Sequence, residues 1–185
     1  MEAVNYLDTV EKLFHYYKSM AEKAIHQIDD HQFHQKIHPE DNSVAIILQH
    51  MIGNMRSRFT DFFTSDGEKS WRDRESEFLD PALGKSQLLH EWESAWITVF
   101  TAIDQARGHP LDAIVYIRNE GHTVLEAFQR QLAHYAYHTG QIVFLSKSLA
   151  GSHWKSLSIP KGQSDSFNAE KFSKDKSKSF FTDKM

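Results

Sequence analysis

Apolar residues recur at steps of three and four along four segments of the chain, the spacing that places side chains on one face of an α-helix. The pattern predicts long amphipathic helices over residues 4–28, 43–64, 85–106 and 123–150. Their apolar positions are Leu7, Val10, Phe14, Tyr17, Ala21, Ala24 and Ile28; Ile47, Met51, Met55, Phe59 and Phe62; Leu88, Leu89, Trp92, Trp96, Val99 and Ile103; and Leu125, Phe128, Leu132, Ala136, Thr139 and Val143.

Signals for helix ends support this division. Ser43 is a suitable N-cap for the second segment, and Pro110 stops the chain from continuing the third as a helix. Thr123 and Glu126 form a capping-box sequence that opens the fourth segment, and Gly151 follows its end.

The segments between these helices are polar and contain helix breakers. Pro39 lies in the connection over residues 29–42, and Pro81 lies in the long connection over residues 65–84. Before the fourth helix, the run AIVYIRNEGHTV is β-branched and aromatic and has a turn signal at residues 119–121, which predicts a short strand or hairpin. We therefore expect an all-α protein, a four-helix bundle with a short strand or hairpin before its last helix.

A polar extension follows the fourth helix. We assign residues 1–160 to the bundle and residues 161–185 to a C-terminal extension that is partly mobile. The final run KDKSKSFFTDKM is the part expected to be mobile, whereas apolar residues predict that the first half of the segment from Ser152 on packs onto the bundle. These apolar residues are Trp154, Leu157, Ile159, Phe167 and Phe172.

The composition is that of an ordinary globular domain, with 40% hydrophobic and 25% charged residues and a formal net charge of −4. A mildly acidic chain lacks the basic face of nucleic-acid-binding proteins, and no apolar run approaches the ~20 residues that span a bilayer. We therefore expect neither a nucleic-acid partner nor a membrane partner.

The absence of cysteine excludes disulfides and thiolate ligands. The N-terminus MEAVNYLDTVEKLF does not have the layout of a signal peptide, so we predict a cytoplasmic protein. Any metal site must consist of His, Asp, Glu or backbone oxygen, which makes the twelve histidines the feature to explain.

Two pairs of histidines lie four residues apart, His34 with His38 and His134 with His138. Twelve histidines in 185 residues give about 0.8 such pairs by chance, so the spacing alone does not identify a site. Pro39 disfavours helical geometry at His38, which places the first pair at a helix end or in a loop. The second pair lies inside the fourth helix, where this spacing places both imidazoles on one face.

A metal ion bound by His134 and His138 needs a ligand from another helix. His50 lies in the middle of the second helix among apolar residues and is expected to be at least partly buried. Three neutral imidazoles with an open position form the ligand set of catalytic zinc sites. The residues alone leave open a second interpretation, in which these histidines are hydrogen-bonded polar residues that bind no metal.

Three other polar residues accompany the candidate ligands. Asn54 and Arg58 follow His50 on the same side of the second helix, and polar residues there are more often surface or interface residues than catalytic ones. His90 in the third helix is a lower-ranked candidate for a fourth ligand or a residue that orients one, because its neighbour Glu91 indicates an exposed position. On the fourth helix, the predicted apolar stripe lies beside the histidine pair, which favours a cleft between helices.

The histidines occur in sequence blocks that resemble the DinB/YfiT-like superfamily of metal-binding bacterial four-helix-bundle proteins. The matching blocks are LQHMIGNMRSRFTDFF in the second helix and RQLAHYAYHTGQIVFL in the fourth. The resemblance covers roughly residues 1–160 and implies that His50, His134 and His138 bind one divalent ion, commonly zinc or nickel, with water completing the coordination. The long second connection and the C-terminal extension depart from the family pattern, so a substrate is not carried over.

Characterised members of that superfamily include bacillithiol S-transferases and a mycothiol-dependent maleylpyruvate isomerase. The resemblance thus implies an enzyme with a small-molecule substrate, and a low-molecular-weight thiol is the candidate partner. A thiol that coordinates the metal ion would lose its proton and become a thiolate. Arg58 or a lysine would then hold the carboxylates of the thiol. Metal-dependent hydrolysis is the related alternative and needs a general base, for which Glu91 and Glu120 are candidates.

A non-catalytic, stress-related dimeric scaffold that binds the metal is the competing hypothesis. An enzyme is expected to have an open cavity of several hundred Å³ beside the histidines, whereas a structural site is expected to be sealed.

Aromatic residues on the first and third helices predict a homodimer, because aromatics left outside a core tend to be buried by a partner. The alternative is that the C-terminal extension, with Trp154 and Phe167, folds back and covers them. The residues concerned are Tyr6, Tyr16, Trp92, Trp96 and Phe100.

Overall fold

The computed structural model describes residues 3–177 and 181–182, which form a mostly helical fold with one small β-hairpin. Strands β1 (Ile114–Ile117) and β2 (Glu120–Thr123) pair antiparallel directly before the last long helix, as predicted. Two short 3-10 helices, η1 (Ser76–Phe78) and η2 (Gly151–His153), complete the described elements. The α-helices are α1 (Ala3–Ile25), α2 (Asp30–His34), α3 (Val44–Phe59), α4 (Lys85–Ala106), α5 (Val124–Ala150) and α6 (Ser164–Phe172).

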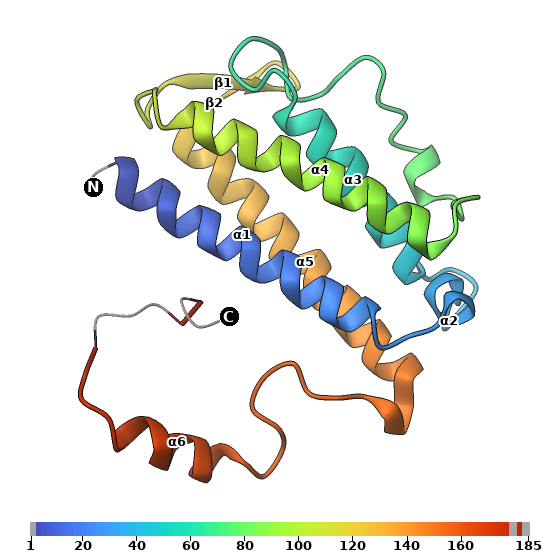
Figure 1. Cartoon of the computed structure of the whole chain (residues 1–185). Helices are drawn as coiled ribbons and strands as arrows, with labels where there is room; N and C mark the ends of the chain where they lie inside the picture. Colours follow the sequence, from blue (N-terminus) through green and yellow to red (C-terminus); the bar gives the residue numbers. More distant parts are fainter. Residues whose placement is uncertain (1–2, 178–180, 183–185) are drawn as a thin grey trace.

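Each of the four long helices packs against two of the others. Helix α1 packs along α5 and α3 packs along α4, and further contacts join α3 to α5 and α1 to α4. Figure 1 shows α1 beside α5 and α4 beside α3, with the hairpin at one end of the helices. Because α3 and α5 are neighbours, side chains from these two helices can meet in one site.

Local signals set most helix ends. The Ser43 hydroxyl accepts a hydrogen bond from the Ile46 amide at 3.2 Å and caps α3. Thr123 and Glu126 cap α5 reciprocally, with each side chain bound to the backbone amide of the other. The predicted bounds of α4 are confirmed, whereas α3 ends at Phe59 rather than at residue 64 because the backbone of Thr60 is extended.

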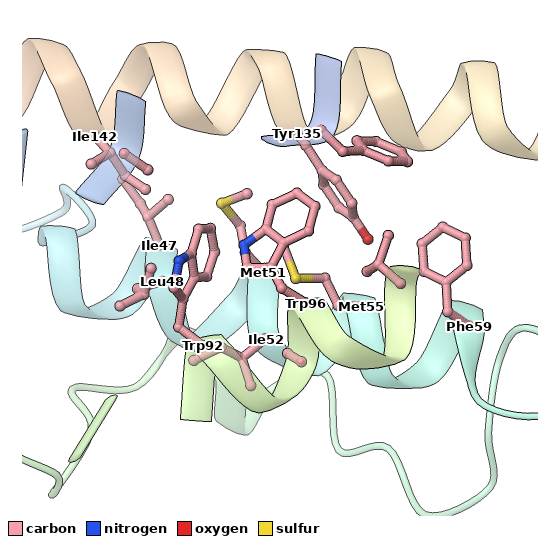
Figure 2. Packing of buried hydrophobic residues seen from close by; sticks show 14 of the residues in the cluster. Ile47, Leu48, Met51, Ile52, Met55, Phe59, Trp92, Trp96, Tyr135 and Ile142 are labelled. Carbon is pink, nitrogen blue, oxygen red and sulfur yellow. The ribbon is translucent and has the colours of Figure 1, made fainter. Parts of the chain in front are cut away.

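The core lies between the long helices and does not depend on the histidine pair. Figure 2 shows Met51 and Met55 of α3 beside Trp92 and Trp96 of α4, with Tyr135 of α5 in the same cluster. All five side chains are at most 1% exposed. Large aromatic side chains contribute much of the apolar surface that folding buries, so this cluster is a major part of the core.

The β-hairpin turns at Arg118 and Asn119, whose φ angles of 57° and 60° are left-handed, as a type I′ turn requires. The turn predicted from the sequence, over residues 119–121, began one residue too late. The Asp66 carboxylate accepts hydrogen bonds from the backbone amides of Arg118 and Asn119, each at 2.8 Å. The Gly67 amide also donates to the Tyr116 carbonyl at 2.7 Å. The long connection after α3 is therefore tied to the hairpin.

The aromatic residues behind the homodimer prediction pack within the chain. Trp92 and Trp96 are buried in the core, and Phe100 stacks on Trp96 with ring centroids 5.4 Å apart. Tyr16 meets the C-terminal residue Phe181 edge to face at 5.1 Å. Both the helical core and the C-terminal segment therefore cover these rings. The homodimer stays a prediction, and these residues no longer provide an argument for it.

The segment that follows α5 packs onto the helices in its first residues, before residue 161. Trp154 and Leu157 contact the core, whereas Phe167 is 40% and Phe172 is 85% exposed. Helix α6 has no buried residue, and Figure 1 shows it apart from the four long helices. The predicted packing is confirmed for Trp154 and Leu157, and it is wrong for Phe167 and Phe172 of α6.

The predicted mobility of residues 174–185 concerns in part residues 178–180 and 183–185, which lie outside the described residues. Within the described part of the chain, no helix combines the length and apolar character needed to cross a membrane.

Candidate metal centre

Three histidines from the neighbouring helices α3 and α5 meet at one place. His50 is 6% exposed in the middle of α3, and His134 and His138 lie half-buried, one turn apart, on α5. The Nε2 atom of His134 is 3.4 Å from Nε2 of His50 and 3.0 Å from Nε2 of His138. Each ring offers one nitrogen within 4.8 Å of those of the other two. The structure therefore brings the three predicted ligands together.

The outer ring nitrogens of two of these histidines bind oxygen acceptors. His50 Nδ1 lies 2.8 Å from Oε2 of Glu77, and His138 Nδ1 lies 2.7 Å from Oε1 of Gln141. Because an ionised carboxylate only accepts hydrogen bonds, His50 carries a proton on Nδ1. The Gln141 amide donates through Nε2 to the Tyr137 hydroxyl at 3.0 Å and turns Oε1 towards His138, which gives His138 the same tautomer. The Nε2 lone pairs of both rings then converge on His134, an arrangement that a cation between the rings would stabilise.

Glu77 reaches His50 from η1, which lies in the long connection between α3 and α4. The Gln49 side-chain amide holds η1 against α3 by donating to three backbone carbonyls, including that of Glu77 at 3.2 Å. Gly53 makes room for the carboxylate, because a β-carbon there would lie 2.2 Å from Oε1 of Glu77. The position of this carboxylate therefore depends on both Gln49 and Gly53.

The Glu77 carboxylate is also paired with Arg72, whose Nε and Nη2 donate to it at 2.7 and 2.9 Å. Burial alone would raise the pKa of Glu77, but the hydrogen bonds from His50 and Arg72 outweigh this effect and lower it. The carboxylate therefore stays ionised at neutral pH. Phe78 stacks on the His50 ring at 4.8 Å between centroids and further restricts the orientation of the imidazole.

The two histidines of α5 are held in the neutral form. Burial, together with the nearby His138 and His50, lowers the pKa of His134 from 6.5 to about 3. Burial also lowers the pKa of His138 to about 4, although the hydrogen bond to Gln141 opposes this shift. Neutral imidazoles are the form that binds metal ions, so these two rings are ready to act as ligands near neutral pH.

A cavity of about 240 Å³ opens beside the three histidines. His50 and His134 form part of its wall, so the centre is open on this side. The rest of the wall is strongly basic, and no Asp or Glu is among the described residues that line it. The other lining residues are Asn54, Arg58, Arg72, Arg74, Arg118, Arg130 and Gln131.

Two polar residues singled out in the second helix lie in this wall. The side-chain oxygen of Asn54 accepts a hydrogen bond from the buried Tyr135 hydroxyl at 3.2 Å. Arg58 donates to the Gly67 carbonyl and, at 2.9 Å, to the Glu68 carboxylate. Both are therefore built into the structure around the centre.

The remaining candidates lie away from the centre. His90 is exposed on α4 and is not part of the histidine cluster, as its acidic neighbour indicated. Glu91 pairs with Arg56, and Glu120 is exposed in the hairpin. His34 ends α2 and its Nδ1 lies 3.1 Å from Asp80. None of these residues lines the cavity.

Comparison with known proteins identifies the family. A family model described as a protein of unknown function (DUF1572) matches residues 1–163. The chain belongs to the DUF1572 family. Comparisons with curated proteins and with solved structures gave no match. The DUF1572 match ends close to residue 160, where we place the boundary between the helical body and the extension.

Sequence reasoning missed Glu77 and the basic wall of this DUF1572 protein. Glu77 and Arg72 lie in the connection WRDRESEF, which has no apolar periodicity to predict its packing. Its unusual length was the available signal, because long connections within compact domains are often functional. A carboxylate that orients a ligand histidine is also a common feature of metal sites.

Proposed function

We propose that this DUF1572 protein is a divalent-metal-dependent enzyme with His50, His134 and His138 as the ligands. The observation that carries the proposal is the convergence of the ring nitrogens while Glu77 and Gln141 hold the outer nitrogens of two of the rings. Carboxylates and amides in this position orient ligand histidines in metalloproteins. We also infer that the four long helices form a DinB/YfiT-like bundle, which the pairwise helix contacts support.

The donor set fits a zinc or nickel ion. Two nitrogens at 2.0–2.1 Å from a tetrahedral ion are about 3.3 Å apart. The separations of 3.0 and 3.4 Å between His134 and its two neighbours lie close to this value. Imidazole nitrogen suits zinc and nickel among the divalent ions, and a bound ion would lower the pKa of a coordinated water or thiol.

Thiol transfer is the reaction that this site favours over hydrolysis. Hydrolysis needs a general base beside the attacking water, but both oxygens of Glu77 are already bound by His50 and Arg72. Glu77 does not line the cavity, and the described lining residues include no carboxylate. A thiolate needs no such base, because its sulfur attacks an electrophilic carbon as the leaving group departs with the bonding pair and the thiol proton passes to water.

The cavity beside the histidines supports an enzyme rather than a sealed scaffold. Its volume of about 240 Å³ lies just below the range of about 300–1,000 Å³ for ligand pockets, so the substrate would have to be small. Gln141 and Glu77 keep the rings aimed at one point, and the basic wall selects what approaches them. Asn54 and Gln131 provide polar groups on the same wall.

Metal analysis combined with a thiol-conjugation screen tests this proposal. Purified wild type should contain about one equivalent of zinc or nickel and conjugate a low-molecular-weight thiol to an electrophile. His138→Ala should lose both properties, and His90→Ala, which alters an exposed histidine outside the centre, should keep both. If the protein binds metal but conjugates none of the thiols, the result would favour the non-catalytic, metal-binding scaffold instead.

A further inference from the structure

The cavity beside the metal centre has an excess of positive charge. Its wall contains five arginines, from α3, the long connection, the hairpin turn and α5. Three carboxylates pair with these arginines, namely Glu68, Glu75 and Glu77. Five guanidinium groups against three carboxylates leave two positive charges, which favours an anionic ligand.

The arginines fall into a buried pair and an exposed set. The side chains of Arg58 and Arg72 are 5% and 2% exposed, and both bind carboxylates of the protein. Arg74 and Arg118 are about half exposed, at 48% and 53%, and Arg130 is exposed on α5. The exposed arginines have weaker partners. Arg118 lies 3.2 Å from Glu68, which also serves the buried pair, Arg74 lies 3.5 Å from the exposed Glu75, and Arg130 lies 3.0 Å from the His122 ring.

Two buried polar atoms of this wall lack a partner within the described structure. One is Nε of Arg58, and the other is Oε1 of Gln131, a residue that is only 3% exposed. Buried polar groups in proteins are nearly always hydrogen-bonded, and an exception needs an explanation. A ligand in the cavity that carries an acceptor for Arg58 and a donor for Gln131 would provide it.

We propose that this cavity binds the carboxylate or phosphate group of a small organic anion, with Arg74, Arg118 and Arg130 as the recognition residues. Planar guanidinium groups bind both kinds of oxyanion through paired N–H donors. The reactive end of the same molecule would then lie at the histidines, a part of the inference that rests on the proposed function. Anion binding itself depends only on the arginines.

Calorimetric titration of the full-length, metal-free protein tests the inference. Inorganic phosphate and succinate are the two anionic probes, and the neutral succinamide is the control ligand. The titrations are made at low ionic strength, because salt screens exposed charges. Wild type should bind at least one anion and not succinamide, and the stronger anion identifies the preferred group.

The variants are chosen so that the backbone is unchanged. Arg118→Asn keeps a residue that tolerates the left-handed φ of 57°, and Arg130→Gln removes the charge from an exposed helical position. Each should weaken anion binding about tenfold, the effect of one charge-assisted hydrogen bond. Arg56→Gln is the matched control, because Arg56 pairs with Glu91 outside this cavity and its loss removes the same charge.

Two results would overturn the inference. One is wild type that binds neither anion, and the other is Arg56→Gln weakening binding as much as Arg118→Asn, which would indicate attraction by net charge alone. Metal content is measured in parallel and should be unchanged in Arg118→Asn. A protein that binds anions but no metal would refute the proposed function and leave this inference standing, whereas the reverse result would refute only the inference.

Discussion

Gly53 of α3 and Glu77 of η1 lie so close together that a β-carbon at position 53 would be 2.2 Å from the Glu77 carboxylate. The same carboxylate binds Nδ1 of His50 and the guanidinium group of Arg72. A residue without a side chain in the middle of a helix therefore determines whether a predicted metal ligand is oriented.

Gly53→Ala should weaken zinc binding about 10- to 100-fold, because the carboxylate that orients His50 must move. Alanine improves helix propensity by about 1 kcal/mol, but displacement of Glu77 breaks charge-assisted hydrogen bonds worth about 1.5–3 kcal/mol each. We therefore expect net destabilisation. Competition with a chelating dye measures the affinity. Gly140→Ala is the control, because an added β-carbon at Gly140 of α5 has nothing within 4 Å. This variant of the protein should be slightly more stable than wild type.

Glu77→Gln should destabilise the protein by about 3 kcal/mol, because a buried arginine loses its main counter-charge. Arg72 is 2% exposed, and Glu68, at 3.4 Å, would be its remaining carboxylate partner. Urea denaturation of the metal-free protein measures the loss. Glu93→Gln removes the same charge from a side chain that is 57% exposed, so its effect should stay below about 1 kcal/mol. Equal effects would show that Glu77 has no special structural role.

Removal of the metal should leave the protein folded, because the core around Trp92 and Trp96 is complete without the histidines. His134→Ala should lose metal and keep the helical circular-dichroism signal of wild type. Added zinc should raise the melting temperature of wild type and of His90→Ala, but not that of His134→Ala. Unfolding of wild type by a chelator would instead identify a structural site.

The metal-free protein should become less stable as the pH falls from 6.5 towards 4. In the unfolded chain, His134 and His138 take up protons near their ordinary pKa of about 6.5. In the folded chain, their pKa values are lowered by burial to about 3 and about 4. The unfolded state therefore binds more protons in this range, and the free energy of unfolding decreases. Urea titrations at pH 7 and pH 5 should show a smaller decrease for His134→Gln than for wild type, and equal decreases would contradict the prediction.

The helices and their caps could be predicted because the signals are local. The bounds of α4 and the capping box of α5 follow from neighbouring residues, and so do the β-hairpin and the spacing of His134 and His138. The buried stripe of α5 was predicted less well. Gln131 and Tyr135 are buried in place of Leu132 and Ala136, which are half-buried. Tyr135 has an apolar body and satisfies its hydroxyl on Asn54, a pairing that periodicity does not reveal.

The surroundings of the centre could not be predicted, because they depend on contacts between distant segments. Glu77 lies 27 positions from His50 in the sequence and meets it where Gln49 binds η1 and Gly53 leaves room for the carboxylate. Arg118 joins the cavity wall through the hairpin turn. Asp66, which precedes α4 in the sequence, binds this turn, which follows α4. Periodicity and spacing describe one element at a time and contain no information on such pairings.

The predicted ligands and two of the three exposed arginines come from different kinds of structure. His50 and His134 are carried by long helices, whereas Arg74 and Arg118 lie in a connection and a hairpin turn. Surface loops accept replacements and changes of length more readily than packed helices do. Evolution can therefore alter the electrical character of the entrance without rebuilding the coordination chemistry, so that members of one family can keep a common reaction and diverge in the molecules they admit.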